Sequence, residues 1–103
     1  GLTSAKNFIL PQVPSWAEPV WHLFVIRTKE RDLLQKRMEK NGIQTLIHYP
    51  VPPHLQPAYR EMGFSAGSFP LSERIHREVL SLPMGPHLSA EQLQRVVEGI
   101  QLF

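Results

Sequence analysis

The 103-residue sequence contains no cysteine. This absence excludes disulfide bonds, thiolate chemistry and cysteine-type zinc sites. No apolar run approaches the roughly 20 residues that a membrane-spanning helix needs, and the start lacks the charged, apolar and small-residue order of a signal peptide. We therefore expect a soluble, cytoplasmic protein. The first residue is Gly1 and not methionine, which predicts a processed or truncated product.

An excess of charge of one sign is also missing. The formal net charge at pH 7 is only +2. In segment 27–40 the acids Glu30, Asp32 and Glu39 lie among six lysine and arginine residues. Nucleic-acid-binding surfaces concentrate lysine and arginine without interleaved acids. The pattern therefore favours a solvated helix face, and we expect neither a nucleic acid nor a membrane as a partner.

Common catalytic motifs are absent. The sequence has no Gly-x-Ser-x-Gly elbow, no glycine-rich phosphate loop and no His-Glu-x-x-His motif. Asp32 is the only aspartate, which nearly excludes aspartate-dependent acid–base schemes. His48 and His54 lie close in sequence, but a metal site needs three or four ligands and this spacing matches no metal motif. We predict no catalytic residue and no metal site on this chain.

Residues 42–55 form the stretch around which the chain is organised. Alternating β-branched and polar residues predict a strand at 43–49, and the prolines that follow end its pairing. A strand alternates its side chains, so His48 and Tyr49 are expected to point in opposite directions. The stiff turn after them is expected to present His48, Tyr49 and His54 in one small region.

Two interpretations of Tyr49 are open from the residues alone. A buried tyrosine usually packs in the core with its hydroxyl bonded to a backbone carbonyl, and a tyrosine at a strand end can equally contact a ligand. His22 is expected to be a hydrogen-bonded structural histidine, His76 to lie on a surface helix, and His87 to order the turn before the last helix.

Composition and periodicity predict a β-α-β-α-α-β-α order. The first half is expected to contain a central, doubly covered strand at 20–27, a helix at about 29–41 capped by Thr28 and ended by Gly42, and the strand at 43–49. A short helix at 54–62, stopped by Gly63, is expected next, followed by a helix that Ser72 caps and that has Leu71, Ile75 and Val79 on one face. The chain is expected to end with a strand at 81–84 and a last helix opened by the capping box of Ser89 and Gln92.

These elements predict an α+β fold, in which a small sheet of about three strands has helices packed against it. If the strands at 20–27 and 43–49 share a sheet, the helix crossover makes them parallel, either adjacent or with another strand between them. Residues 1–19 are expected to be an irregular lead-in, and residues 20–103 to form the single domain. Two surface ion pairs are expected along the helix after Ser72, Glu73 with Arg77 and Arg74 with Glu78.

Several segments together resemble one enzyme family. They are Trp21-His22-Leu23-Phe24-Val25-Ile26-Arg27, Arg31-Asp32, Gly42-Ile43-Gln44-Thr45, His48-Tyr49-Pro50, Pro53-His54-Leu55-Gln56-Pro57-Ala58-Tyr59 and Leu80-Ser81-Leu82-Pro83-Met84. Over about residues 17–101 they look like the C-terminal small domain of the DegT/DnrJ/StrS sugar-nucleotide aminotransferases. This resemblance implies the small domain of an aspartate-aminotransferase fold and pyridoxal phosphate (PLP) as cofactor of the complete enzyme.

The resemblance also implies what this chain would contribute. The Schiff-base lysine and most cofactor contacts belong to the family's large N-terminal domain, so no cofactor-binding residue is assigned here and the chain is expected to be inactive alone. His48 and Tyr49 are the implied sugar-contacting residues, and Tyr59 is a further candidate. The implied substrates of the complete, dimeric enzyme are glutamate and a keto deoxysugar on dTDP or UDP, in lipopolysaccharide, O-antigen or antibiotic-sugar synthesis.

Another class of function remains open, namely a stand-alone, non-enzymatic binding or regulatory module that shares the small-domain pattern. If the chain is instead part of an enzyme, its separation exposes the surface that the large domain covers. Trp16, Trp21, Phe64 and Phe69 are the candidates for that patch, and they predict self-association.

Overall fold

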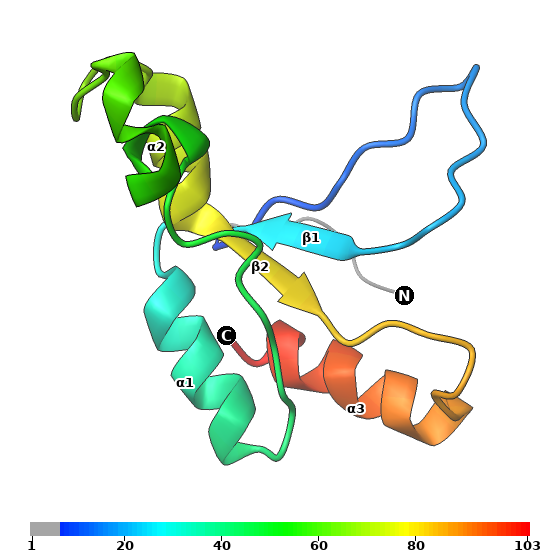
Figure 1. The fold of residues 1–103 in the computed structure, drawn as a ribbon. Helices are drawn as coiled ribbons and strands as arrows, with labels where there is room; N and C mark the ends of the chain where they lie inside the picture. The colour runs from blue at the N-terminus through cyan, green and yellow to red at the C-terminus, as the bar shows by residue number, and fades with distance from the viewer. Residues whose placement is uncertain (1–6) are drawn as a thin grey trace.

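The computed structural model describes residues 7–103. The elements in chain order are β1 (Phe24–Arg27), α1 (Arg31–Lys40), the 3-10 helices η1 (Pro53–Leu55) and η2 (Pro57–Met62), α2 (Pro70–Glu78), β2 (Val79–Leu82) and α3 (Ala90–Gln101). Figure 1 shows the small sheet at the centre with the helices around it. The predicted α+β class is confirmed.

The sheet has two strands within the described residues, β1 and β2, which pair antiparallel. Phe24 lies opposite Leu82, and Arg27 lies opposite Val79. Pairing between the two strands ends at Phe24 and Leu82, and Pro83 is the next residue of the chain. The predicted strand at 20–27 is therefore shorter than expected: residues 20–23 have no partner and lie exposed.

Single bridges extend the sheet on both sides. Ile9 exchanges backbone hydrogen bonds with Arg27, and Leu46 does so with Ser81. The segment at 43–49 therefore runs parallel to β1 with β2 between them, which was one of the two predicted arrangements. It is not the regular strand that was predicted, because only Leu46 reaches β2. The strand expected at 43–49 is accordingly reduced to a bridge. The strand expected at 81–84 is β2, which begins at Val79 and ends at Leu82.

The core lies between the sheet and the helices α1 and α3, which pack against each other. Its buried members are Phe8, Ile26, Leu34, Met38, Ile43, Leu80, Leu82, Val96 and Ile100. The strand that is buried throughout is β2, whereas three of the four residues of β1 are only half-buried. The prediction that the first strand is doubly covered is thus wrong, although β1 does lie between Ile9 and β2 in the sheet.

The first and last helices follow their sequence signals closely. Gly42 adopts the left-handed conformation (φ +74°) that was predicted at the end of α1. Thr28 does not cap α1 directly, since its hydroxyl oxygen accepts the N–H of Glu30, which is itself the residue immediately before the helix. The predicted capping box of α3 is present, with Ser89 Oγ accepting from Gln92 N and Gln92 Oε1 accepting from Ser89 N.

Helix α2 differs from its prediction. It begins at Pro70, where the fixed φ of proline suits the first helical position, and not after Ser72. Val79 belongs to β2, so the expected apolar stripe is broken. The expected ion pairs along the helix are also absent from the described structure, because Glu78 instead bonds Arg27 of β1 at 2.7 Å and Glu73 turns back to the preceding loop.

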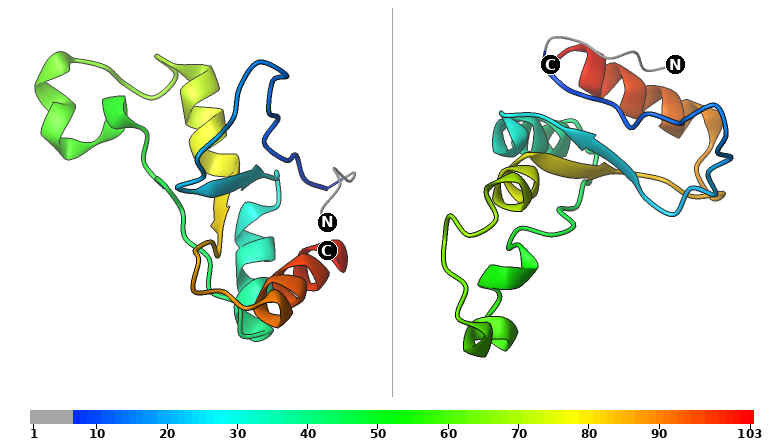
Figure 2. Two further views of the ribbon diagram at one scale, coloured as in Figure 1. Left: turned by 90° about the vertical axis from the view of Figure 1, so that its right-hand side faces the viewer. Right: turned by 90° about the horizontal axis from the view of Figure 1, so that it is seen from above.

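The predicted helix at 54–62 is two 3-10 helices. Gln56 separates them in an extended conformation (φ −72°, ψ 142°), because the ring of Pro57 disfavours a helical residue before it. Gly63 then ends η2 with a positive φ, as predicted. Both views in Figure 2 show residues 53–69 as a lobe that projects from the sheet beyond α2.

The four aromatic residues proposed for an exposed patch are all exposed in this structure. Trp21 packs on Phe24, whereas Phe64 packs on Phe69 in the projecting lobe. The loop that carries Trp16 and the lobe that carries Phe64 lie on opposite sides of the sheet in Figure 1. The aromatic residues therefore occupy two separate surfaces and not one patch.

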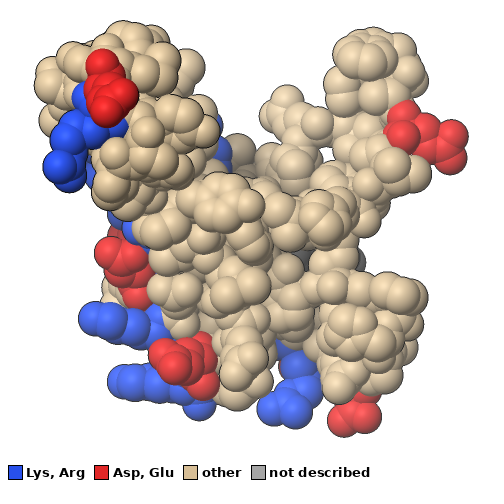
Figure 3. Space-filling view, viewed as in Figure 1, with Lys and Arg blue, Asp and Glu red and all other residues tan. Residues whose placement is uncertain are grey.

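The surface charges are mixed. On the face drawn in Figure 3, lysine and arginine lie beside acidic residues at the edge, and the centre of the face is uncharged.

Among residues 7–103, none of the helices is long and apolar enough to cross a membrane. The lead-in carries one core residue, Phe8, while its residues 1–6 lie outside the described part, so the boundary at residue 19 stays a prediction.

Candidate functional site

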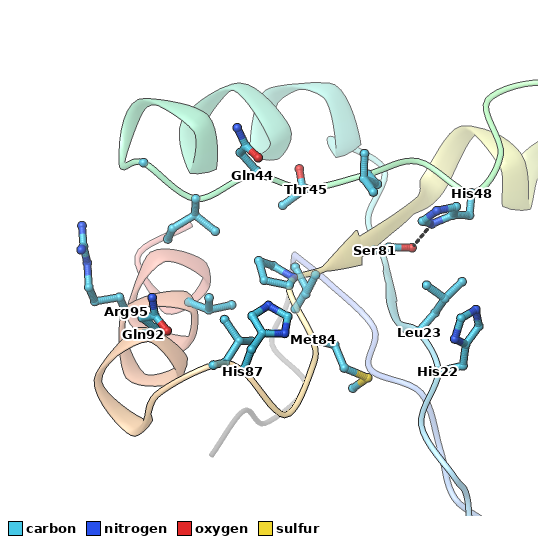
Figure 4. Close-up of a pocket in the computed structure, with 17 residues that line it drawn as sticks. His22, Leu23, Gln44, Thr45, His48, Ser81, Met84, His87, Gln92 and Arg95 are labelled. Carbon is cyan, nitrogen blue, oxygen red and sulfur yellow. Dashed lines mark hydrogen bonds between the residues drawn. The ribbon is translucent and has the colours of Figure 1, made fainter.

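A pocket of about 590 Å³ opens beside the carboxyl end of β2. Its wall is formed by the segment at 42–48, by the end of β2 with Pro83 and Met84, by the first turns of α3, and by His22 and Leu23 before β1. Figure 4 shows His48 and Ser81 at one end of this pocket and His87, Gln92 and Arg95 at the other. Polar side chains from four separate segments thus surround one cavity.

His48 is held in place by Ser81. The Nδ1 atom of His48 lies 2.8 Å from the hydroxyl oxygen of Ser81 in β2 (Figure 4). The backbone bridge between Leu46 and Ser81 brings these two side chains to the same face of the sheet, since residues two apart in an extended chain share a face. The predicted site residue His48 is therefore a fixed part of the pocket wall.

Tyr49 lies outside the pocket lining. Its ring packs edge-on against that of His48, with the centroids 5.4 Å apart, so the two rings are neighbours and do not point apart as predicted. The peptide bond between the two residues is cis. Tyr49 is 62% exposed, which rules out the interpretation that it packs in the core. Its hydroxyl makes no hydrogen bond to any residue in the described range, so it is available to a ligand.

Tyr59 and His54 lie in the projecting lobe. Tyr59 is half-exposed in η2 and does not line the pocket. His54 contacts α2 instead, where its Nε2 lies 3.2 Å from a carboxylate oxygen of Glu73. The expectation that His54 joins His48 and Tyr49 at one small site is not met, because Glu73 and Phe69 hold the His54 ring in the lobe.

Glu73 is the anchor of this lobe. Its carboxylate accepts hydrogen bonds from the backbone N–H groups of Gly67, at 2.9 and 3.0 Å, and of Phe69, at 3.2 Å. The Gly67 bond is the main reason that the pKa of the Glu73 carboxyl is lowered, and the bonds from His54 and Phe69 act in the same direction, against partial desolvation. The ionised carboxylate therefore ties the loop at 63–69 to α2.

Three histidines line the pocket, namely His22, His48 and His87. Even so, no group of three or more His, Cys, Asp or Glu side chains within residues 7–103 is arranged to hold a metal ion. The prediction that His22 is a hydrogen-bonded structural histidine is wrong, since it is exposed and makes no described side-chain hydrogen bond. Its ring faces the pocket from the segment before β1 (Figure 4).

The described residues do not fit a PLP site. A Schiff base needs a lysine beside the reacting atoms, and no lysine lines the pocket. Lys6 lies outside the described residues. Asp32, the sole aspartate of the chain, pairs with Arg31 at the start of α1. The lining of this pocket therefore offers no side chain that could hold PLP as a Schiff base.

Sequence reasoning missed Ser81, Gln92 and Arg95 as pocket residues. Gln92 was assigned only to the capping box, and nothing in the pattern distinguishes Arg95 from other surface arginines. Ser81 did carry a signal, because it is the one polar residue between Leu80 and Leu82 in a strand that is buried throughout. A polar side chain in such a strand needs a partner, and here the partner is His48.

Comparison with known proteins places the chain among aminotransferases. Residues 1–101 match the model of the DegT/DnrJ/EryC1/StrS aminotransferase family. The chain is 51% identical over 94 residues to the dTDP-3-amino-3,6-dideoxy-alpha-D-galactopyranose transaminase of Aneurinibacillus thermoaerophilus, which covers 91% of this chain and 25% of the relative. It is 50% identical over 100 residues to the erythromycin biosynthesis sensory transduction protein EryC1 of Saccharopolyspora erythraea, which covers 97% of this chain and 27% of the relative.

The fold is similar to that of a solved member. The crystal structure of S. venezuelae DesV in complex with a ketimine intermediate matches 93% of this chain and 26% of its own, with a TM-score of 0.89 and 46% identity. The chain therefore spans about a quarter of the length of the relatives it matches. With the family model covering nearly the whole sequence, the chain belongs to the DegT/DnrJ/EryC1/StrS aminotransferase family.

Proposed function

We propose that this chain is the C-terminal small domain of a PLP-dependent aminotransferase that transfers an amino group from glutamate to a nucleotide-linked keto deoxysugar. The observation that carries the proposal is the 51% identity to a dTDP-amino-sugar transaminase over nearly the whole chain. The TM-score of 0.89 against a family member trapped with a ketimine supports it. We place this enzyme in the cytoplasm. Its proposed role is in the synthesis of lipopolysaccharide, O-antigen or antibiotic sugars.

The cofactor belongs to another part of the proposed enzyme. The chain spans about a quarter of its relatives, and its pocket contains no lysine. Both facts support a large N-terminal domain that supplies the Schiff-base lysine. PLP, when bound there, would act as the electron sink for amino transfer. The isolated chain is then inactive, and the complete enzyme is a homodimer in this proposal.

His48 and Tyr49 are the proposed substrate contacts. His48 is fixed on the pocket wall and Tyr49 is exposed beside it, with its ring against the His48 imidazole. Imidazole and phenol groups donate hydrogen bonds to hydroxyl and phosphate oxygens, and a wrong hexose would leave them unpaired. Tyr59 is a further proposed contact. Its ring is half-exposed in η2, in the projecting lobe, and it does not line the pocket.

A second candidate function is a stand-alone regulatory or binding module. One observation favours it: the relative from S. erythraea carries the name of a sensory transduction protein at 50% identity. The same pocket would then bind a ligand without turning it over. The two candidates differ in what lies upstream of Gly1 in the gene.

Cofactor binding separates the two candidates. The protein expressed from its complete reading frame is expected to show the absorbance of a PLP Schiff base and to aminate a dTDP-linked keto sugar with glutamate as donor, whereas residues 1–103 alone do neither. A complete protein that stays colourless with PLP and does not turn over the sugar contradicts the aminotransferase and leaves the regulatory module.

The substrate contacts are tested in the active complete protein. Tyr49→Phe removes one hydroxyl without changing the ring, and it is expected to raise the KM for the sugar nucleotide about 5- to 10-fold, the effect of one lost hydrogen bond. Tyr59→Phe is the matched variant in the lobe and is expected to have a smaller effect. An unchanged KM in Tyr49→Phe removes this residue from the site.

A further inference from the structure

The hydroxyl of Ser81 is buried and has one described partner. Ser81 is only 4% exposed, and its backbone N–H and C=O are both used by Leu46. The hydroxyl oxygen contacts Nδ1 of His48 at 2.8 Å, and this is the hydrogen bond described for it among residues 7–103. His48 is therefore the protein partner of this hydroxyl.

The direction of that bond follows from counting protons. If Nδ1 of His48 carried the proton and donated it, the hydroxyl hydrogen of Ser81 would have no acceptor among the described residues, and an unpaired donor on a residue that is 4% exposed is costly. If Ser81 donates instead, its proton is bonded and Nδ1 accepts with its lone pair. In a neutral imidazole the remaining proton then lies on Nε2.

We propose that Ser81 is a positioning residue that holds His48 as the Nε2–H tautomer, so that this N–H is presented as a hydrogen-bond donor to an acceptor oxygen of the ligand. Nε2 of His48 has no hydrogen-bond partner among the described residues, while the ring lines the pocket. The identity of the ligand as a sugar nucleotide rests on the proposed function; the tautomer does not.

The arrangement restricts what the His48 end of the pocket can bind. A neutral Nε2–H donates one hydrogen bond and accepts none, so it pairs with a hydroxyl, carbonyl or phosphate oxygen and not with an ammonium group. The ring plane is fixed twice, by Ser81 at Nδ1 and by the edge-on contact with Tyr49. A donor fixed in this way loses little freedom when the ligand arrives.

Histidine NMR tests the tautomer directly. In ¹⁵N-histidine-labelled protein from the complete reading frame, at about pH 8.5 and so well above the ordinary histidine pKa of about 6.5, long-range ¹H–¹⁵N correlation identifies which ring nitrogen is protonated. We expect an unprotonated Nδ1 and a protonated Nε2 for His48. A protonated Nδ1 in the wild-type protein overturns the proposal by itself, without any variant.

Variants show whether Ser81 is the cause. Ser81→Ala is expected to shift the ratio of the two His48 tautomers about fivefold toward Nδ1–H, the equilibrium equivalent of one ordinary hydrogen bond. Ser81→Cys, which keeps a weak donor of similar size, is expected to lie between. Ser89→Ala is the matched serine-to-alanine control, because Ser89 caps α3 outside the pocket lining and its loss should leave the ratio unchanged.

A ratio that is the same in Ser81→Ala and the wild type overturns the role of Ser81. If Ser81→Ala does not fold, which loss of the folded protein's NMR signals would reveal, Ser81→Cys and the wild type still decide the question.

Ligand binding tests the presented donor. Binding of dTDP and of dTDP-glucose is measured by calorimetry with the complete protein. In Ser81→Ala we expect dTDP-glucose to bind about fivefold more weakly; if dTDP weakens equally, the acceptor is a diphosphate oxygen, and if dTDP is unchanged, it lies on the hexose. Unchanged binding of both overturns the donor role. A wild-type protein that binds neither refutes the proposed substrate class, and the NMR result then decides the tautomer separately.

Discussion

The Nδ1 atom of His76 donates a hydrogen bond of 2.6 Å to the backbone carbonyl oxygen of Tyr49, which lies 27 residues earlier in the chain. A carbonyl oxygen only accepts, so the proton of this bond must be on His76. Helix α2 thus fixes the backbone of the candidate site from one side, while β2 fixes the His48 side chain from the other.

This geometry predicts the tautomer of His76. In the histidine NMR spectrum His76 should have a protonated Nδ1, the opposite of the tautomer proposed for His48, because its partner is a carbonyl and not a hydroxyl. His76→Ala should lower the free energy of unfolding by about 0.5–1 kcal/mol, the net value of one such bond. Arg77→Ala, the next residue of the helix and exposed, is the control. An unprotonated Nδ1 on neutral His76 would contradict the observed bond.

The anchoring carboxylate predicts a pH dependence. The pKa of Glu73 is lowered in the folded state, chiefly by the Gly67 N–H, so its contribution to stability is complete above the unfolded-state pKa of about 4.3 and is lost as the pH falls through the lower folded-state pKa. Glu73→Gln should therefore be less stable than the wild type at neutral pH, and the gap should narrow below about pH 4. Denaturant unfolding at a series of pH values measures it.

Glu61→Gln is the control for this prediction, because Glu61 is an exposed glutamate of η2 for which no side-chain hydrogen bond is described. Its stability difference from the wild type should not depend on pH in the same way. A gap for Glu73→Gln that stays constant from neutral to acidic pH would mean that the carboxylate does not anchor the loop.

Two threonines, the buried Thr28 and the half-buried Thr45, predict opposite responses to the same change. Thr45 Oγ1 is buried without a hydrogen-bond partner among the described residues, so Thr45→Val should stabilise the protein by about 1 kcal/mol. Thr28, which is 4% exposed, accepts the N–H of Glu30, so Thr28→Val should destabilise it by about 1 kcal/mol. Thermal or denaturant unfolding of both variants gives the comparison, and equal signs would refute the assignment of partners.

The sequence determined the features that depend on neighbouring residues. The capping box of Ser89 and Gln92, the left-handed glycines at 42 and 63, and the α+β class all follow from local backbone preferences and side-chain periodicity. The residues of the family resemblance also led to the family that the comparison confirms. His48 was singled out because the end of an extended segment before a proline turn is a local signal, and it does line the pocket. Its contact with a substrate stays a prediction.

Tertiary structure alone decided the pairings across the chain. The length of β1 depends on how far β2 pairs with it, which ends at Leu82, and no local pattern in residues 20–27 reveals that. The acids of α2 were expected to pair within their helix, but Glu78 lies close to Arg27 and Glu73 close to the 63–69 loop. Ser81 and His48 are 33 residues apart, and their bond exists because a single bridge at Leu46 brings the two segments together.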